Sequence, residues 1–231
     1  ASRTGTSFLV YTLTQNTTSG IRSGSLTVAG QTIPIRSAGR MTAVSATNYY
    51  SMLAPDSIIA LFGLDLANST QIADSKPLPA NLSGTEVQLT DYAGQKARAP
   101  LFYVSPTQIN FKVPQRIQYV DDPVLIVGKS VTVEVYRNGE LVANGFAPYR
   151  RVAPGLFTMN SDLLGPPAGT IYRVKADGSA RYEPISEYDP VKQRFVAKPI
   201  SFGDETDQVY LLLFCSGVRG RKQLSSVDRK S

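Results

Sequence analysis

The chain has 231 residues, of which 42% are hydrophobic, 18% charged and 9% aromatic, and this is enough apolar surface for a globular fold. It contains no histidine, which excludes a Ser-His-Asp triad, a Cys-His dyad and an HExxH zinc helix. Its single cysteine allows no disulfide within the chain, so a hydrophobic core must hold the fold together.

The net charge of +6 is a property of the two ends of the chain. Residues 1–40 hold four arginines and no acid, and residues 216–231 hold five bases and one acid, whereas residues 41–215 carry a small excess of acids. A nucleic-acid groove needs clustered bases interleaved with stacking aromatic rings, and only the Arg219–Lys222 stretch comes close. The sequence therefore predicts no nucleic-acid partner.

The first 40 residues are expected to form three strands, at 7–13, 24–28 and 31–35. The last two form a hairpin in which Gly30 supplies the positive φ of the turn, and Pro34 is expected to face solvent on an edge. Three strands are too few for a stable sandwich, so this segment is interpreted as the end of a module.

Residues 16–33 resemble the last strands of the BACON-type immunoglobulin-like repeats of bacterial surface proteins. The resemblance covers about residues 6–37. It implies that an incomplete immunoglobulin-like unit opens the chain.

The middle of the chain alternates short apolar runs with turn residues, which is typical of an all-β fold. The clearest signal is Asn138-Gly139, which favours a type I′ turn between two antiparallel strands. A turn is also expected at 91–94, and residues 67–82 are interpreted as a loop. The strands expected here are 58–62, 85–90, 99–106, 108–114, 130–136 and 140–143.

Residues 98–114 are similar to the signature of the Solibacter-type C-terminal domain of large exported bacterial proteins, and three further segments extend the similarity. These are residues 54–67, 152–158 and 205–214. The resemblance covers about residues 41–231 and implies an immunoglobulin-like sandwich exported from a bacterial cell.

Residues 58–66 and 210–218 have similar sequences, and this internal repeat indicates a second sandwich. We therefore expect tandem immunoglobulin-like β-sandwiches, the first and last incomplete, with divisions at 1–40, 41–148 and 149–231.

In the last unit, strands are expected at 170–175, 180–184 and 194–200, forming a meander with one solvated face because its alternate residues are large and polar. The apolar strand at 209–214 is expected to be covered by this 170–200 meander or by a neighbouring chain.

Two acidic clusters and the cysteine are the candidate chemical sites. Asp121-Asp122 and the group Asp204, Glu205 and Asp207 lack the spacing of an EF-hand loop, so calcium is the weaker interpretation and a solvated loop the stronger one. Cys215 is expected to be a packed small residue on a buried strand. We therefore predict no catalytic residue, no metal site and no cofactor.

The tyrosines allow two interpretations. They could form a patch on which sugar rings stack, or their rings could pack on a core and leave the hydroxyl groups exposed to solvent. The candidates for such a patch are Tyr49, Tyr50, Tyr103, Tyr119, Tyr149, Tyr172, Tyr182 and Tyr188.

The resemblances imply a non-catalytic extracellular module of a larger bacterial protein, secreted or on the cell surface, that serves as a spacer, adhesion or attachment domain. Its partners would be other domains of the parent chain and a protein or glycan ligand. The longest apolar run, 209–215, is far shorter than the roughly 20 residues of a membrane-spanning helix, so no membrane span is predicted. The alternatives are a carbohydrate-binding module and a hydrolase that uses two carboxylates within roughly 10 Å.

Overall fold

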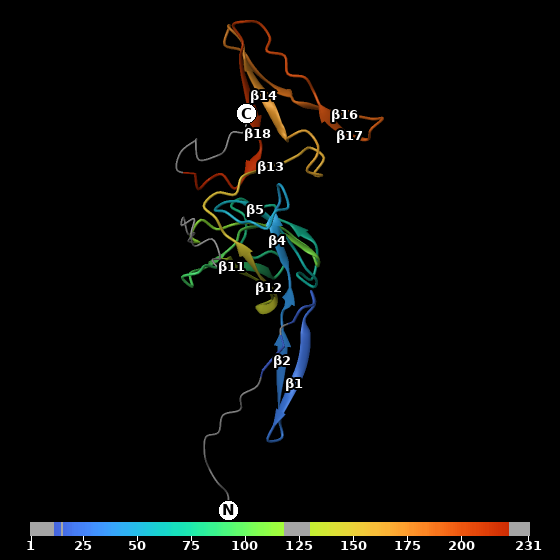
Figure 1. Ribbon diagram of the computed structural model, residues 1–231, viewed down its shortest axis with the longest axis vertical. Coiled ribbons are helices and arrows are strands. Elements are labelled where there is room, and N and C mark those ends of the chain that lie inside the picture. The colour runs from blue at the N-terminus through green and yellow to red at the C-terminus, as the bar shows by residue number, and fades with distance from the viewer. Residues whose placement is uncertain (1–11, 15, 118–129, 222–231) are drawn as a thin grey trace, which may run out of the picture.

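The computed structural model describes residues 12–14, 16–117 and 130–221, and within these ranges the chain is all-β, without a helix. This confirms the expected fold class. Three parts follow one another along an elongated body: an N-terminal hairpin, a central sandwich and a C-terminal unit (Figure 1).

The N-terminal hairpin consists of β1 (Arg22–Val28) and β2 (Gln31–Ser37). Ala29 and Gly30 both adopt positive φ, of 49° and 80°, which confirms the expected turn. Pro34 is exposed in this two-stranded sheet, as expected for a residue that cannot donate to a ladder. Most of the strand expected at 7–13 lies outside the described residues.

Two five-stranded sheets form the central sandwich, with strand orders β4-β5-β10-β9-β6 and β3-β12-β11-β7-β8. Asn138 and Gly139 have φ of 52° and 82°, so the hairpin between β11 and β12 has the expected type I′ turn. The expected loop at 67–82 contains one short strand, β6. The strands are β3 (Gly39–Arg40), β4 (Thr42–Ser45), β5 (Ile58–Phe62), β6 (Gln71–Ile72), β7 (Thr85–Thr90), β8 (Lys96–Arg98), β9 (Leu101–Val104), β10 (Gln108–Lys112), β11 (Ser130–Arg137) and β12 (Glu140–Pro148).

Most of the hydrophobic core belongs to the sandwich. Buried and half-buried residues alternate along β7 and along most of β11, because one face of each strand points inward. The largest fully buried side chains are Phe111, Leu53, Ile59, Leu61, Leu66, Leu89, Leu101, Ile109, Ile117, Val87, Val104 and Val113. By contrast, Ile171 and Ile185 are the only buried hydrophobic residues among those described after Tyr149.

The C-terminal unit contains a three-stranded sheet of order β15-β14-β18 and two smaller sheets, β16-β17 and β13-β19. The expected hairpin at 170–184 is confirmed by the pairing of β14 with β15. The strands are β13 (Gly155–Leu156), β14 (Gly169–Val174), β15 (Ala180–Pro184), β16 (Ser186–Asp189), β17 (Arg194–Ala197), β18 (Gln208–Leu213) and β19 (Cys215–Ser216).

The strand expected at 194–200 does not extend this hairpin. Residues 194–197 form β17, which pairs with β16 instead. The reason is a local turn, in which the Asp189 carboxylate accepts hydrogen bonds from the backbone N–H groups of Val191 and Lys192, and Gln193 adopts a φ of 51°. This turn returns the chain onto β16 before it can reach β15.

The apolar strand β18 pairs with β14, which confirms that the 170–200 region covers one of its edges. Its side chains are nevertheless exposed, with Tyr210, Leu211 and Leu212 at 49%, 50% and 42% of their full exposure. Cys215 is also exposed, so the expectation of a buried cysteine is wrong. Among the described residues no second sheet packs over the C-terminal three-stranded sheet, and its apolar strand therefore stays at the surface.

Side-chain contacts join the three parts. Arg36 of the N-terminal hairpin pairs with Glu140 of the sandwich at 2.7 Å. At the other end, the backbone N–H of Ile58 donates to the hydroxyl of Ser216 at 2.7 Å, and Arg219 pairs with Asp56 at 3.2 Å. The two segments of the internal repeat, residues 58–66 and 210–218, thus meet at this second junction.

Candidate functional site

The two faces of the C-terminal three-stranded sheet carry different side chains. Alternation along β14 places Ile171 and Arg173 on one face and Thr170 and Tyr172 on the other. The first face has a charge network centred on Arg173, and the second has a row of tyrosines. These are the two candidate sites.

Arg173 is buried, with only 3% of its side chain exposed, although the sequence pattern predicts a solvated face for the polar residues of this hairpin. Its Nε donates to Glu183 at 2.7 Å, and its Nη1 donates to Asp207 at 3.1 Å. The remaining hydrogen bonds go from Nη2 to Glu183 and from the two terminal nitrogens to the backbone carbonyls of Ser201 and Phe202. These five contacts match the five N–H donors of a guanidinium, which explains how the charge is buried.

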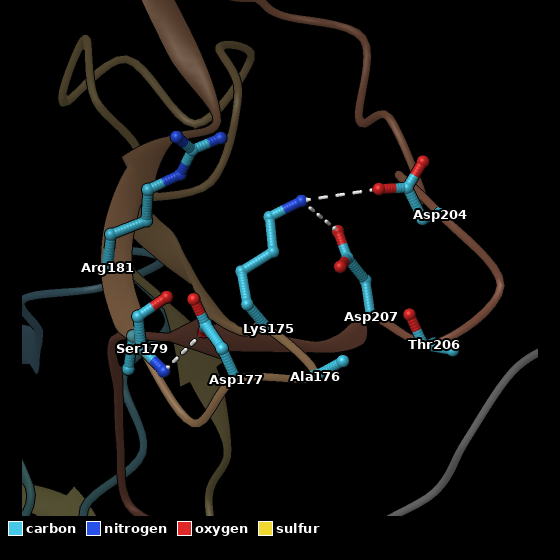
Figure 2. A pocket seen from close by; sticks show the side chains of 9 residues that line it. Lys175, Ala176, Asp177, Ser179, Arg181, Asp204, Thr206 and Asp207 are labelled. Carbon is cyan, nitrogen blue, oxygen red and sulfur yellow. Dashed lines mark hydrogen bonds and ion pairs between the residues drawn. The ribbon is translucent and has the colours of Figure 1, made fainter.

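Further cations complete the network. Lys175 contacts Asp207 at 3.0 Å and Asp204 at 3.7 Å, and Figure 2 shows its ammonium group pointing between these two carboxylates. Arg181, which lies on the same face of the sheet as Arg173 and whose side chain is 67% exposed, contacts Glu183 at 2.7 Å. Three bases and three acids therefore balance one another.

The cations set the protonation of the network. Hydrogen bonds from Arg173 and then from Arg181 lower the pKa of Glu183 from 4.5 to about 2. The pKa of Asp207 is also lowered, first by the hydrogen bond from Lys175 and then by the one from Arg173. Both carboxylates are held in the charged form.

An open depression of about 610 Å³ lies beside the network. Its lining, drawn in Figure 2, comes from the turn between β14 and β15, the start of β15 and the segment before β18. The carboxylate of Asp177 in that turn accepts a hydrogen bond from the backbone N–H of Ser179, and this bond stabilises the turn. The lining residues are Lys175, Ala176, Asp177, Ser179, Ala180, Arg181, Asp204, Thr206 and Asp207.

The acidic cluster Asp204, Glu205 and Asp207 does not converge on a common point as metal ligands would. Asp204 and Asp207 contact the cation Lys175, and both Asp204 and Glu205 are exposed. In the described part of the chain, no group of three or more His, Cys, Asp or Glu residues could hold a metal ion. Asp121-Asp122 lies outside the described residues.

The other face of the sheet carries three tyrosines in one row, Tyr182, Tyr172 and Tyr210, which we call the tyrosine strip. Tyr172 on the middle strand is directly opposite Tyr182 of β15 and Tyr210 of β18. The ring centres are 5.1 Å and 6.3 Å apart, and the rings are tilted by 42° and 35°. Tyr182 is 69% exposed and Tyr210 49%, so the strip is open to solvent.

The remaining tyrosines that the sequence suggested do not join this strip. Tyr149 is buried in the sandwich, and its hydroxyl donates to the carbonyl of Ile117 at 3.2 Å. Tyr188 packs edge-on against Phe195 in the β16-β17 hairpin. Tyr103 lies half-buried on β9, Tyr49 and Tyr50 lie in the loop after β4, and Tyr119 lies outside the described residues.

Sequence reasoning thus named two members of the strip and missed the third. Tyr210 belongs to the apolar run that was interpreted as a buried strand. The signal that could have found it is the alternation on β18, which places Gln208, Tyr210 and Leu212 on one face.

In comparisons with known proteins, no family model, no curated protein and no solved structure matches the chain. In the described ranges no helix is long and apolar enough to cross a membrane. The fold and the two sites therefore define the chain only as an all-β protein with a central two-sheet sandwich.

Proposed function

We propose that this chain is a non-catalytic structural module of a larger exported bacterial protein, which holds neighbouring domains at a fixed separation. The observation that carries the proposal is the end-to-end arrangement of its three parts, with specific side-chain contacts at both junctions (Figure 1). Its partners are the adjoining domains of the parent chain. Its location is secreted or on the cell surface.

The junction between the sandwich and the C-terminal unit has the features of a fixed joint. Asp56 has 12% of its side chain exposed, and both Lys112 of the sandwich and Arg219 of the C-terminal unit contact it, at 3.3 Å and 3.2 Å. Gly155 of the C-terminal unit lies so close to Thr47 of the sandwich that a Cβ at Gly155 would collide with the Thr47 hydroxyl. Ionic contact and close backbone packing together disfavour bending at this point.

The charge network supports a structural role better than a catalytic one. A glycoside hydrolase needs one carboxylic acid whose pKa is raised so that it can donate a proton. In the network the pKa of Glu183 is held at about 2 and that of Asp207 is lowered, which is the opposite direction. Neither of these two carboxylates is therefore suited to be the proton donor of a carboxylate-dependent hydrolase, and we do not propose that function for the network.

The resemblances to the Solibacter-type C-terminal domain and to the BACON-type repeats are consistent with this proposal. The first resemblance implies a large exported bacterial protein and the second a bacterial surface protein. The elongated stack of β units agrees with a spacer or attachment role of this kind.

A distance measurement across the second junction tests the proposal. Spin labels on Gln95→Cys and Val191→Cys, in a Cys215→Ser background, are expected to give one narrow distance distribution by pulsed electron resonance. Asp56→Ala should broaden it, because Arg219 then loses its ionic contact with the sandwich. Asp162→Ala is the matched control, since its partner Arg194 lies within the same unit. A broad distribution in the unmodified junction would contradict a spacer role.

Glycan binding is a second candidate function, and the tyrosine strip is the observation that favours it. Sugar rings stack on exposed aromatic faces, and the strip presents three such rings on the open face of the sheet. The spacer proposal does not depend on it.

We expect Tyr182→Ala and Tyr210→Ala each to weaken binding of a soluble polysaccharide by about tenfold, measured by affinity electrophoresis. Tyr188→Ala is the control, because this ring is 55% exposed but lies outside the strip. Equal loss in all three variants, or no binding on a glycan array, would count against this function.

A further inference from the structure

The two edges of the C-terminal three-stranded sheet are built differently. The β15 edge carries Arg181, Glu183 and Pro184, which are the residues that proteins place on edges to prevent further pairing. The β18 edge runs Gln-Val-Tyr-Leu-Leu-Leu, without a charge or a proline. One edge is therefore protected, and the other is not.

The direction of the backbone groups on β18 follows from its partners. Pro184 of β15 lies opposite Thr170 of β14 and has no backbone N–H to donate, so these two residues form a non-hydrogen-bonded pair. The N–H and C=O groups of Thr170 therefore point to the other side, toward its partner Leu212 on β18. The bond from Lys175 N–H to the carbonyl of Ser179 agrees with this alternation. Val209, Leu211 and Leu213 consequently direct their N–H and C=O groups away from β14.

Within the described residues no strand pairs with this outer edge, because β18 ends the sheet order. The side chains along it are apolar and about half exposed, including Leu211 and Leu212. An exposed row of unpaired backbone groups with uncharged side chains is a template for another strand.

We propose that β18 pairs antiparallel with β18 of a second copy of this chain, across a two-fold axis at Leu211. The outward-facing residues Val209, Leu211 and Leu213 are symmetric about Leu211, so all three can form hydrogen-bonded pairs in one register. No charged side chain of β18 meets its own copy, and hence no like-charge repulsion opposes the pairing. The inference goes beyond the spacer role, since it joins two modules side by side.

Cross-linking tests the register. In an antiparallel hydrogen-bonded pair the Cα atoms are about 5.5 Å apart, which is within the range that a disulfide spans. Leu211→Cys in a Cys215→Ser background is therefore expected to form a disulfide-linked dimer under mild oxidation. Ala180→Cys in the same background is the matched control on the protected β15 edge, and it should stay monomeric. Equal cross-linking at both positions, or none at Leu211, would overturn the proposal.

Sedimentation velocity tests the association itself. We expect a concentration-dependent dimer for the wild-type chain. Leu211→Lys should raise the dimer dissociation constant by about tenfold or more, because two ammonium groups would then face each other. Leu211→Pro should have the same effect while keeping the β14-β18 ladder, since only an outward N–H is lost. A wild-type monomer at every concentration, with unchanged far-ultraviolet circular dichroism in all variants, would refute pairing through β18.

Discussion

Replacing Phe111 by alanine is expected to destabilise the central sandwich by about 3–5 kcal/mol. Phe111 is fully buried on β10, where it lies opposite Ile59 of β5 and Leu101 of β9. Removing its ring leaves a cavity between the two sheets that the packed neighbours can fill only in part.

Urea denaturation followed by circular dichroism measures this loss. Phe146→Ala is the matched control, because Phe146 is 72% exposed on β12 of the same sandwich. A surface substitution of this kind is expected to change the free energy of unfolding by less than about 0.5 kcal/mol. Similar shifts in the two variants would mean that the core does not lie between the two sheets.

The parts of this fold that the sequence predicts are those fixed by short-range chemistry. Asn138-Gly139 requires two positive φ values, and the chain supplies the residue pair that tolerates them at least cost. The alternation along Thr85–Thr90 likewise determines which face is buried. Such signals are independent of distant parts of the chain.

Burial of an apolar run depends on whether another layer covers it, and this is a long-range property. Residues 58–62 and 210–214 have similar apolar composition, yet β5 lies in the core and β18 at the surface. The second sheet of the sandwich makes this difference. Cys215 was predicted to be buried for the same reason and is exposed.

The charge network could not be predicted because its members come from distant segments. Arg173, Glu183 and Asp207 lie on β14, on β15 and just before β18. A period-two pattern assigns Arg173 to one face of the hairpin but does not indicate that residues 201–207 fold over that face. Of the tyrosine strip, Tyr172 and Tyr182 were among the candidates, and only the pairing of β14 with β18 adds Tyr210.

Replacing Arg173 by methionine should remove most of the stability of the C-terminal unit. The unit has few buried apolar side chains, so it depends on the network more than the sandwich depends on any charge. The variant would leave Glu183 and Asp207 without their shared cation and the carbonyls of Ser201 and Phe202 without a donor. We expect its melting temperature to fall by about 10 °C, and we expect protease to cleave residues 198–207 faster because this segment loses its attachment to Arg173.

Arg181→Met is the matched control for this substitution. Arg181 contacts the same carboxylate, that of Glu183, but 67% of its side chain is exposed, so its loss should have little effect. If both methionine variants had the same melting temperature as the wild type, the network would not stabilise the C-terminal unit.

The same network predicts how the unit responds to acid. The pKa of Glu183 is about 2 in the folded chain and 4.5 without its partners. A lowered folded pKa contributes stability that is complete above pH 4.5 and is lost as the pH falls from 4.5 toward 2, because the unfolded chain binds the proton first. Thermal melts between pH 7 and pH 2 should therefore show a decline in this window for the wild type. The decline should be smaller in Arg173→Met and in Glu183→Gln, since neither retains the ion pair between Arg173 and Glu183. An equal decline in all three would locate the acid sensitivity elsewhere in the chain.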